Sequence, residues 1–193
     1  MSITKTQLGK SKYKNDINYF ITNHDLDNLI HNVKIVKFAD LENYESIYDL
    51  LPKKIDFVVI LTETEGINNG HWQLLLRNNN VFEFFDSYGD EPKTIIKFIT
   101  KKMNQYLGND YNKDMGHILK SIKPTDKLII NKYEFQSDTN DVNTCGRHVA
   151  SRIINFMLGM DNKEYIKWFK GIKKQNTKLK NDEIICELIK INI

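Results

Sequence analysis

The chain has 193 residues and a near-balanced charge, with 28 Lys and Arg residues against 25 Asp and Glu residues. This length is typical of one domain, and 40% hydrophobic residues exclude a disordered chain. A net charge of +3 excludes a nucleic-acid binder dominated by electrostatics. We expect a single domain over residues 1–193, with residues 1–18 loosely held and residues 160–193 forming a helical C-terminal segment.

The spacing of the two cysteines, Cys145 and Cys186, fits neither a disulfide framework nor a metal site. We therefore expect a reducing compartment and no bound metal. The first ten residues carry no apolar stretch typical of a secretory signal. No run approaches the roughly 18 apolar residues of a membrane span, so we expect no membrane partner.

Short helices are predicted before the first strand. Residues 25–30 are typical of a short helix capped by Asn23 or His24. Asp40 is a candidate N-cap for a second helix over residues 41–51.

Four strands follow from β-branched and apolar runs. The polar stretch 62–70 predicts a loop, and the asparagines at 78–80 predict a hairpin turn between the second and third strands. The four predicted strands span residues 55–61, 71–76, 81–85 and 127–133.

Longer helices are expected in the second half of the chain. Pro92 is suited to the start of a helix that runs to about residue 107. Asn143 or Thr144 opens a long helix through Leu158, and one or two amphipathic helices follow it.

Five residues have the types and positions of a site for cysteine nucleophilic catalysis. Cys145 lies in the first turn of the predicted long helix, where backbone amides favour a thiolate, and Gly146 lets a substrate backbone approach. Gln136, at the end of the predicted fourth strand, can donate to an oxyanion. His71 and Asp86 are expected at one sheet edge, where the carboxylate can orient the imidazole.

The local strings around these residues occur in the order of a known family. They are Gly70-His71-Trp72, then residues 84–89 (Phe-Phe-Asp-Ser-Tyr-Gly), then Gln136, then residues 143–147 (Asn-Thr-Cys-Gly-Arg). Together they resemble the adenovirus-type endopeptidases and their relatives, the SUMO-specific proteases. The most similar members are the maturation proteases of virophages, Maverick-type elements and large DNA viruses. The resemblance covers about residues 55–160.

The resemblance implies an α+β fold, with a mixed β-sheet flanked by helices in a permuted papain-like order and the nucleophile at a helix N-terminus. It also implies the catalytic roles. Cys145 would be the nucleophile, His71 the general base and acid, and Asp86 the orienting carboxylate. Gln136 would donate to the oxyanion with the Cys145 amide, and Trp72 would form an aromatic wall.

One interval departs from the family pattern. Gln136 lies nine positions before Cys145, an interval longer than in the family's common forms. The insert at residues 139–142 either bulges outward or makes Gln136 the wrong residue for this role.

The implied function is that of a cysteine endopeptidase that cleaves capsid precursor proteins during virion maturation, in the virion and the cytoplasmic virus factory. We expect a monomer. Two alternatives stay open: a protease that removes SUMO or ubiquitin-like proteins from their targets, and a non-catalytic module that binds capsid or DNA. His148, three residues after Cys145, is an alternative base, and Cys186 is expected in the core.

Residues 163–180 carry seven lysines and one glutamate, a net charge of +6. A solvated helix face explains this pattern, and so does a patch that binds DNA phosphates. The resemblance implies DNA or a peptide as an activator, and we expect no other cofactor. The candidate DNA-binding residues are Lys167, Lys170, Lys173, Lys174 and Lys178.

Overall fold

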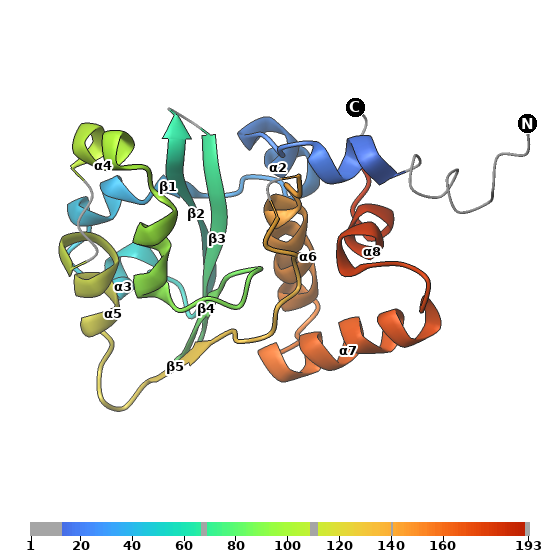
Figure 1. The fold of residues 1–193 in the computed structure, drawn as a ribbon. Coiled ribbons are helices and arrows are strands. Elements are labelled where there is room, and N and C mark those ends of the chain that lie inside the picture. Colours follow the sequence, from blue (N-terminus) through green and yellow to red (C-terminus); the bar gives the residue numbers. More distant parts are fainter. Residues whose placement is uncertain (1–12, 67–68, 109–111, 140, 192–193) are drawn as a thin grey trace, which may run out of the picture. The chain divides into compact units, whose positions relative to one another are not determined.

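A computed structural model describes residues 13–66, 69–108, 112–139 and 141–191 of the chain. The fold is α+β, with one mixed five-stranded sheet flanked by helices, which confirms the expected fold class (Figure 1). The chain divides into two compact units: unit 1 comprises Met1–His31 and Glu134–Ile193, and unit 2 comprises Asn32–Tyr133. A single domain over the whole chain stays a prediction.

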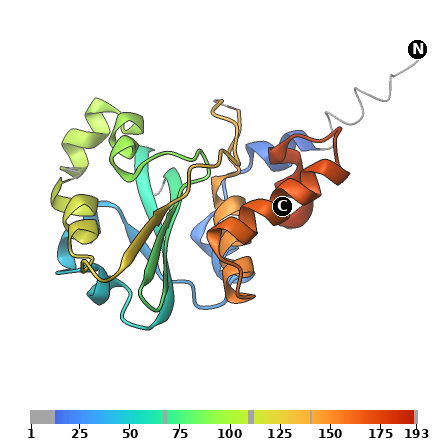
Figure 2. The same ribbon diagram turned by 90° about the horizontal axis from the view of Figure 1, so that it is seen from below.

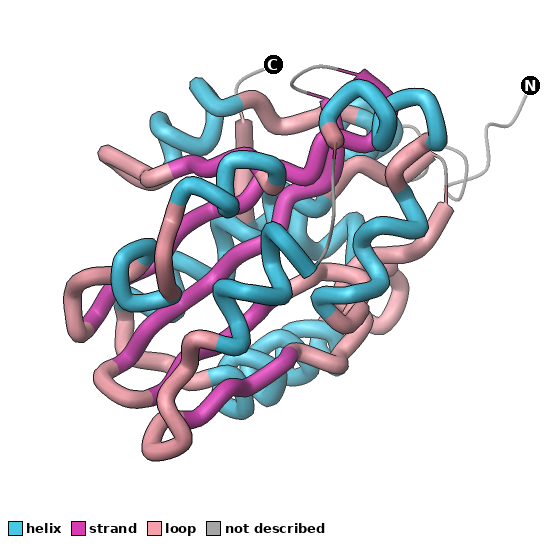
Figure 3. Tube along the Cα trace, turned by 90° about the vertical axis from the view of Figure 1, so that its left-hand side faces the viewer, coloured by secondary structure: helices cyan, strands magenta, loops and turns pink. Residues whose placement is uncertain are grey.

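Unit 2 contains the sheet. Its strands are β1 (Ile35–Lys37), β2 (Ile55–Gly66), β3 (Asn69–Asn78), β4 (Val81–Phe85) and β5 (Lys127–Ile130). Their order in the sheet is that of the sequence. Figure 3 shows strands of the sheet side by side in magenta. The outer pairs β1–β2 and β4–β5 are parallel, whereas the inner pairs β2–β3 and β3–β4 are antiparallel.

The structure confirms the four predicted strands and adds β1, which is too short for its apolar pattern to stand out. The expected loop over 62–70 is wrong, because β2 continues to Gly66 and β3 begins at Asn69. Thr62 and Glu63 look like loop residues by polarity, yet both are buried. Lys37 Nζ lies 3.1 Å from Glu63 Oε1 and compensates the buried carboxylate.

β5 ends earlier than residue 133 because a side chain replaces the strand hydrogen bonds. Asn131 Oδ1 accepts from the backbone N–H of Tyr133 at 3.1 Å, and Asn131 Nδ2 donates to the Tyr133 carbonyl at 3.0 Å. Such local bonds compete with strand pairing. As a result, Gln136 lies in a loop and not at the end of a strand.

Short helices cover one face of this sheet (Figure 1 and Figure 2). They are the 3-10 helices η1 (Ala39–Asn43) and η2 (Pro92–Phe98), the π-helix η3 (Asn112–Gly116), and α3 (Ile47–Leu50), α4 (Lys101–Leu107) and α5 (His117–Lys120). The single helices expected over 41–51 and from Pro92 to 107 are both wrong. Ser46 and Thr100 each cap a new helix inside those ranges, accepting from Asp49 N–H and Met103 N–H.

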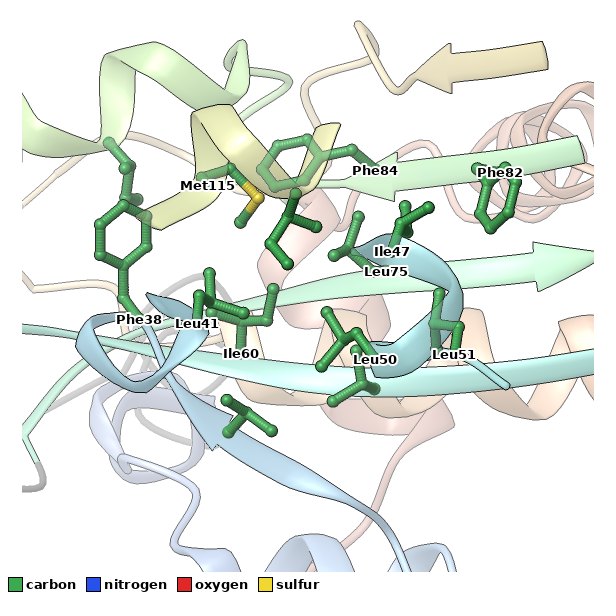
Figure 4. Close-up of a cluster of buried hydrophobic side chains, with 14 residues drawn as sticks. Phe38, Leu41, Ile47, Leu50, Leu51, Ile60, Leu75, Phe82, Phe84 and Met115 are labelled. Atoms are coloured by element: carbon green, nitrogen blue, oxygen red, sulfur yellow. The ribbon is translucent and has the colours of Figure 1, made fainter. Parts of the chain in front are cut away.

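A hydrophobic cluster fills the space between these helices and the sheet (Figure 4). Leu75 is its central strand residue, because its register partners Val58 and Phe84 present their side chains to the same face. Each fully buried side chain of this size contributes about 1.5–3 kcal/mol to stability. The helical members include Leu41, Ile47, Leu50, Met115 and Ile118, each 0% exposed.

Unit 1 is helical. Its helices are α2 (Asn23–Leu29), α6 (Cys145–Met157), α7 (Asn162–Gln175) and α8 (Asn181–Leu188), and residues 13–18 are also helical. α6 contacts α2 and α8, and α7 contacts α8. The predicted long helix and the two C-terminal helices are confirmed. The cap of α2 is Thr22, in a capping box with Asp25, and not Asn23 or His24.

Residues 1–12 of the N-terminal segment expected to be loose lie outside the described residues. The rest of that segment is anchored. Tyr13 is buried, and its hydroxyl donates to the Glu187 carboxylate of α8. The buried Arg147 of α6 donates from Nη2 to the Asp16 backbone carbonyl at 3.3 Å, and the same nitrogen lies 3.6 Å from Asp16 Oδ1.

We predict that Gly70→Ala destabilises the protein by about 1–3 kcal/mol, the usual cost of overpacking. An added Cβ at Gly70 would lie 1.9 Å from the Thr62 carbonyl oxygen on the neighbouring strand, where only backbone could move away. Gly171→Ala in α7 is the matched control, since nothing described lies within 4 Å of its added Cβ. It should stabilise the helix by up to about 1 kcal/mol. Urea unfolding of both variants measures the difference, and equal effects would contradict the argument.

Candidate active site

The first half of the candidate site is a buried pair in unit 2. His71 lies on β3, and Asp86 follows the last residue of β4. His71 Nε2 lies 2.9 Å from Asp86 Oδ2, and the two side chains are 7% and 0% exposed. Because an ionised carboxylate only accepts hydrogen bonds, Nε2 carries the proton and Nδ1 is the nitrogen that can receive one. The expected pairing of His71 with Asp86 is therefore present.

Gln73 fixes the Asp86 carboxylate from the same strand face as His71. Its Nε2 donates to Asp86 Oδ2 at 2.7 Å, and its Oε1 accepts from Thr62 Oγ1 at 3.2 Å. Residues two apart on a strand share a face, and Thr62 is the register partner of His71. This chain of hydrogen bonds ends on the His71 imidazole and limits its rotation.

The turn after Asp86 supplies further contacts to the Asp86 carboxylate and to the His71 ring. Tyr88 N–H donates to Asp86 Oδ1 at 2.8 Å, and the Tyr88 ring stacks on the His71 ring with centroids 4.8 Å apart. Asn131 Nδ2 donates to the Asp86 backbone carbonyl at 2.7 Å. The Asp86 carboxylate thus receives donors from β3 and from the turn after β4, which is what a fully buried carboxylate requires.

Trp72 is buried on the same strand, one residue after His71. Alternation along β3 directs its side chain to the opposite face of the sheet from His71. An aromatic contact to the imidazole comes from the Tyr88 ring. A role for Trp72 as a wall of the substrate cleft stays a prediction.

Cys145 and Gly146 lie in unit 1, at the first two positions of α6, and both are buried. The N-cap residue Thr144 makes no side-chain bond to its own helix. The first backbone amides of the helix therefore keep their capacity to stabilise negative charge near the Cys145 sulfur. The predicted position of the thiol at a helix N-terminus is confirmed.

Gln136 also lies in unit 1, in the loop before α6, and is 1% exposed. Its Nε2 donates to the Val142 carbonyl at 3.0 Å, three residues before Cys145. Within the insert, Val142 N–H donates to the Thr139 carbonyl. The side chain of Gln136 therefore closes the loop that leads to Cys145.

Two pockets of unit 1 border this loop. Gln136, Ser137 and Lys173 are among the residues that line a pocket of about 370 Å³. A second pocket of about 710 Å³ is lined by Ser137, residues of the insert and the start of α8.

Asp182 in the first turn of α8 is another buried carboxylate with several donors. Its Oδ1 accepts from Thr144 Oγ1 at 2.6 Å, and its Oδ2 accepts from Ser137 Oγ at 2.7 Å and from Ser137 N–H at 3.3 Å. Burial raises the pKa of Asp182, but contacts with His148, Thr144 and Ser137 outweigh it and hold that pKa below its ordinary value.

His148 is completely buried between the Phe135 and Phe169 rings. Its Nε2 lies 3.9 Å from Asp182 Oδ1, beyond hydrogen-bond distance, and neither ring nitrogen has a hydrogen-bond partner within the described part of the chain. Burial lowers the pKa of His148, and the Asp182 carboxylate opposes this only in part. His148 is therefore a neutral core residue.

Cys186 on α8 is buried, as predicted, and burial raises the pKa of its thiol to about 12. The predicted residues thus fall into two sets. The structure joins His71 to Asp86 in unit 2, and it holds Gln136 in the loop before Cys145 in unit 1. No group of three or more His, Cys, Asp or Glu side chains among the described residues is arranged to hold a metal ion.

The sequence is similar to a virophage protein. It is 34% identical over 136 residues to "Uncharacterized protein V9" of Sputnik virophage, which covers 69% of this chain and 75% of V9. The chain belongs to the V9 family. No model of a known protein family matches the sequence. The virophage origin that the motifs predicted is consistent with this relative.

Three residues of the V9-family site were missed from sequence. Gln73 had a signal, because it lies two residues after His71 and shares its strand face. Tyr88 stands in the motif around Asp86, but sequence gives no sign of its stacking. Asp182 had no local signal, since 38 positions separate it from Thr144.

The lysines of the predicted DNA-binding surface lie on α7 and the turn after it. Four of them are exposed: Lys167, Lys170, Lys174 and Lys178. Lys173 is half-buried, and its Nζ donates to the Leu179 carbonyl. DNA binding by these residues stays a prediction. None of the helices described for this V9-family chain is both long enough and apolar enough to span a bilayer.

The depressed pKa of His148 predicts a loss of stability in mild acid. The unfolded chain takes up a proton near the ordinary histidine pKa of about 6.5, whereas folded His148 resists it. Stability is therefore complete above that pH and falls below it, by up to about 1.4 kcal/mol per pH unit. His148→Leu should flatten the decline measured by urea unfolding between pH 7.5 and 5.5. His24→Gln, at an exposed histidine, should keep the wild-type slope, and a slope unchanged in His148→Leu would refute the assignment.

Proposed function

We propose that this V9-family protein is a cysteine endopeptidase that cleaves structural precursor proteins of a virus particle. The observation that carries the proposal is the fully buried Asp86 carboxylate bonded to His71 Nε2 at 2.9 Å. Burying a carboxylate is costly, and a core histidine does not need one. An imidazole fixed in one tautomer is what a general base for a thiol requires. The resemblance to adenovirus-type proteases supports the same conclusion.

In the proposed reaction, His71 Nδ1 takes the proton of the Cys145 thiol. The thiolate attacks the scissile carbonyl carbon, forming an S–C bond and an oxyanion. His71 then gives the proton to the leaving amine as the C–N bond breaks. Water hydrolyses the resulting thioester, which returns the thiol and releases the carboxylate product.

The proposed oxyanion donors are the Gln136 side-chain amide and the Cys145 backbone N–H. Both belong to unit 1, and the Cys145 amide is among the first amides of α6, which have no partner within their own helix. The bond from Gln136 Nε2 to the Val142 carbonyl holds this amide in the loop that leads to Cys145. Preorganised donors of this kind each contribute about 10²–10³ in rate.

We propose a capsid precursor as the substrate, on the resemblance to maturation proteases and the virophage relative. The site of action would be the virion and the cytoplasmic virus factory. By the same resemblance, cleavage near glycine is expected, because a narrow cleft excludes larger side chains. DNA or a peptide would act as an activator, and the protein would work as a monomer.

Removing the nucleophile tests the proposal directly. Co-expression with the capsid protein encoded in the same genome should yield capsid fragments whose masses define the cleavage sites. Cys145→Ala should abolish these fragments, because no thiolate remains to attack. Cys186→Ala is the matched control, since that thiol is buried with a pKa of about 12, and it should keep cleavage. Identical fragments with Cys145→Ala would leave a non-catalytic binding module as the better function.

Asp86→Asn tests the orienting carboxylate. Asn keeps the size of the side chain but loses the charge that stabilises protonated His71 during the reaction. We expect the cleavage rate to fall by at least about 10²-fold, the scale of general acid–base catalysis. Asp56→Asn is the control at another aspartate of the same sheet, where backbone N–H groups are the partners. A cleavage rate within about two-fold of wild type in Asp86→Asn would exclude Asp86 from the mechanism.

The choice of substrate distinguishes a maturation protease from the alternative, a deconjugating protease. A ubiquitin-like precursor with a Gly-Gly tail is digested beside the capsid protein. Preferential cleavage after the Gly-Gly tail would favour a deconjugating protease with the same four catalytic residues. Cleavage of the capsid protein alone would favour the maturation protease.

A further inference from the structure

We propose that Asp182 is a positioning residue that holds both oxyanion donors of the site, an inference that rests on the proposed function. The two donors are the Gln136 amide and the Cys145 backbone N–H. Asp182 touches neither. It binds the residue next to each of them, Ser137 and Thr144.

The distances show a two-pronged contact. Asp182 Oδ2 receives the Ser137 hydroxyl at 2.7 Å and the Ser137 backbone N–H at 3.3 Å. Asp182 Oδ1 receives the Thr144 hydroxyl at 2.6 Å. Each carboxylate oxygen thus fixes one end of the loop 137–144. Charge-assisted bonds of this length are roughly twice as strong as neutral ones.

The burial of these groups makes the contact specific. Asp182 is 2% exposed and Thr144 is 0% exposed, so water does not compete for the carboxylate. Thr144 is the N-cap residue of α6, yet its hydroxyl bonds Asp182 and makes no bond to its own helix. A threonine at this position normally satisfies a helix amide. Here the hydroxyl is used across the loop, and the first amides of α6 remain available to an oxyanion.

The contact also accounts for the long interval between Gln136 and Cys145. A loop of this length has many conformations, and its ends must be fixed if the two donors are to converge on one oxygen. Gln136 Nε2 bonds Val142, and Asp182 bonds both flanking residues. With both flanking residues fixed, the positions of the two donors do not depend on the length of the insert. α8, which carries Asp182, is part of the site and not an accessory helix.

Two reactions of Cys145 separate positioning from general stability. Iodoacetamide alkylates the thiolate by displacing iodide, so an S–C bond forms, a C–I bond breaks and no oxyanion arises. p-Nitrophenyl acetate acylates the same sulfur through an oxyanion, with the C–O bond breaking and p-nitrophenolate leaving; water then hydrolyses the thioester. The ratio of the acylation rate to the alkylation rate therefore reports the donors alone. Mass spectrometry of the Cys145 peptide assigns both products.

Asp182→Asn should lower this ratio by about 10- to 100-fold, because Asn has one acceptor oxygen in place of two and cannot accept from both Ser137 and Thr144 as the carboxylate does. Thr144→Val, which replaces only the hydroxyl, should lower it in the same direction, and Thr144→Ser should restore it. Combining Asp182→Asn with Thr144→Val should cost less than the product of the single effects, since one contact is lost in both. Thr144→Val also keeps the test valid if Asp182→Asn fails to fold.

Glu183→Gln is the matched control. It removes an equal charge from the same first turn of α8 but keeps the oxygen that caps Lys180 N–H. Its ratio should equal that of wild type. An unchanged ratio in both Asp182→Asn and Thr144→Val would overturn the positioning role. A wild-type protein whose ratio equals that of a free thiol would instead overturn the proposed acyl-transfer function, so the two failures are distinct.

Discussion

The burial of the Asp86 carboxylate is the constraint on which the geometry of the candidate site depends. A charge removed from water must be surrounded by donors, and leaving one without its partner costs about 3–5 kcal/mol. His71, Gln73 and Tyr88 supply these donors, from β3 and from the turn after β4. The hairpin register, the tight turn at 86–89 and the tautomer of His71 follow from the same requirement. The hydrogen bonds that stabilise the buried carboxylate thus also orient the proposed general base.

Each unit is organised around one such aspartate. Asp86 gathers donors at the end of the sheet in unit 2, and Asp182 gathers them at the start of α6 in unit 1. In both units, the hydrogen-bond donors to the aspartate include residues close in sequence to a proposed catalytic group. A catalytic group needs freedom to react, whereas its neighbours can be held rigidly. This division explains why Asp182 bonds Ser137 and Thr144, the residues next to the proposed oxyanion donors.

The features that were predicted correctly from sequence are those that depend on the local pattern of residues. The strands at 55–61, 71–76 and 81–85 have continuous apolar runs, and the start of α6 has a distinct cap region, so both were predictable. The extension of β2 through Thr62 and Glu63 was not, because their burial relies on Lys37 and Gln73 from other strands. The predictions of single helices across Ser46 and across Thr100 were wrong for a related reason. A serine or threonine hydroxyl can begin a new helix within an amphipathic run, and only packing decides whether it does.

The contact of Asp182 shows why the long loop before Cys145 is compatible with a preorganised site. Sequence alone leaves two choices for residues 139–142, an outward bulge or a different oxyanion donor. A carboxylate that binds the residues on both sides of the loop removes the dependence of the donors on loop length, since the ends are fixed regardless of what lies between them. Instead, α8 must place the Asp182 carboxylate within hydrogen-bond distance of both Ser137 and Thr144. For this reason α8, part of the segment 160–193 that the sequence predicts to be helical, belongs to the proposed catalytic machinery.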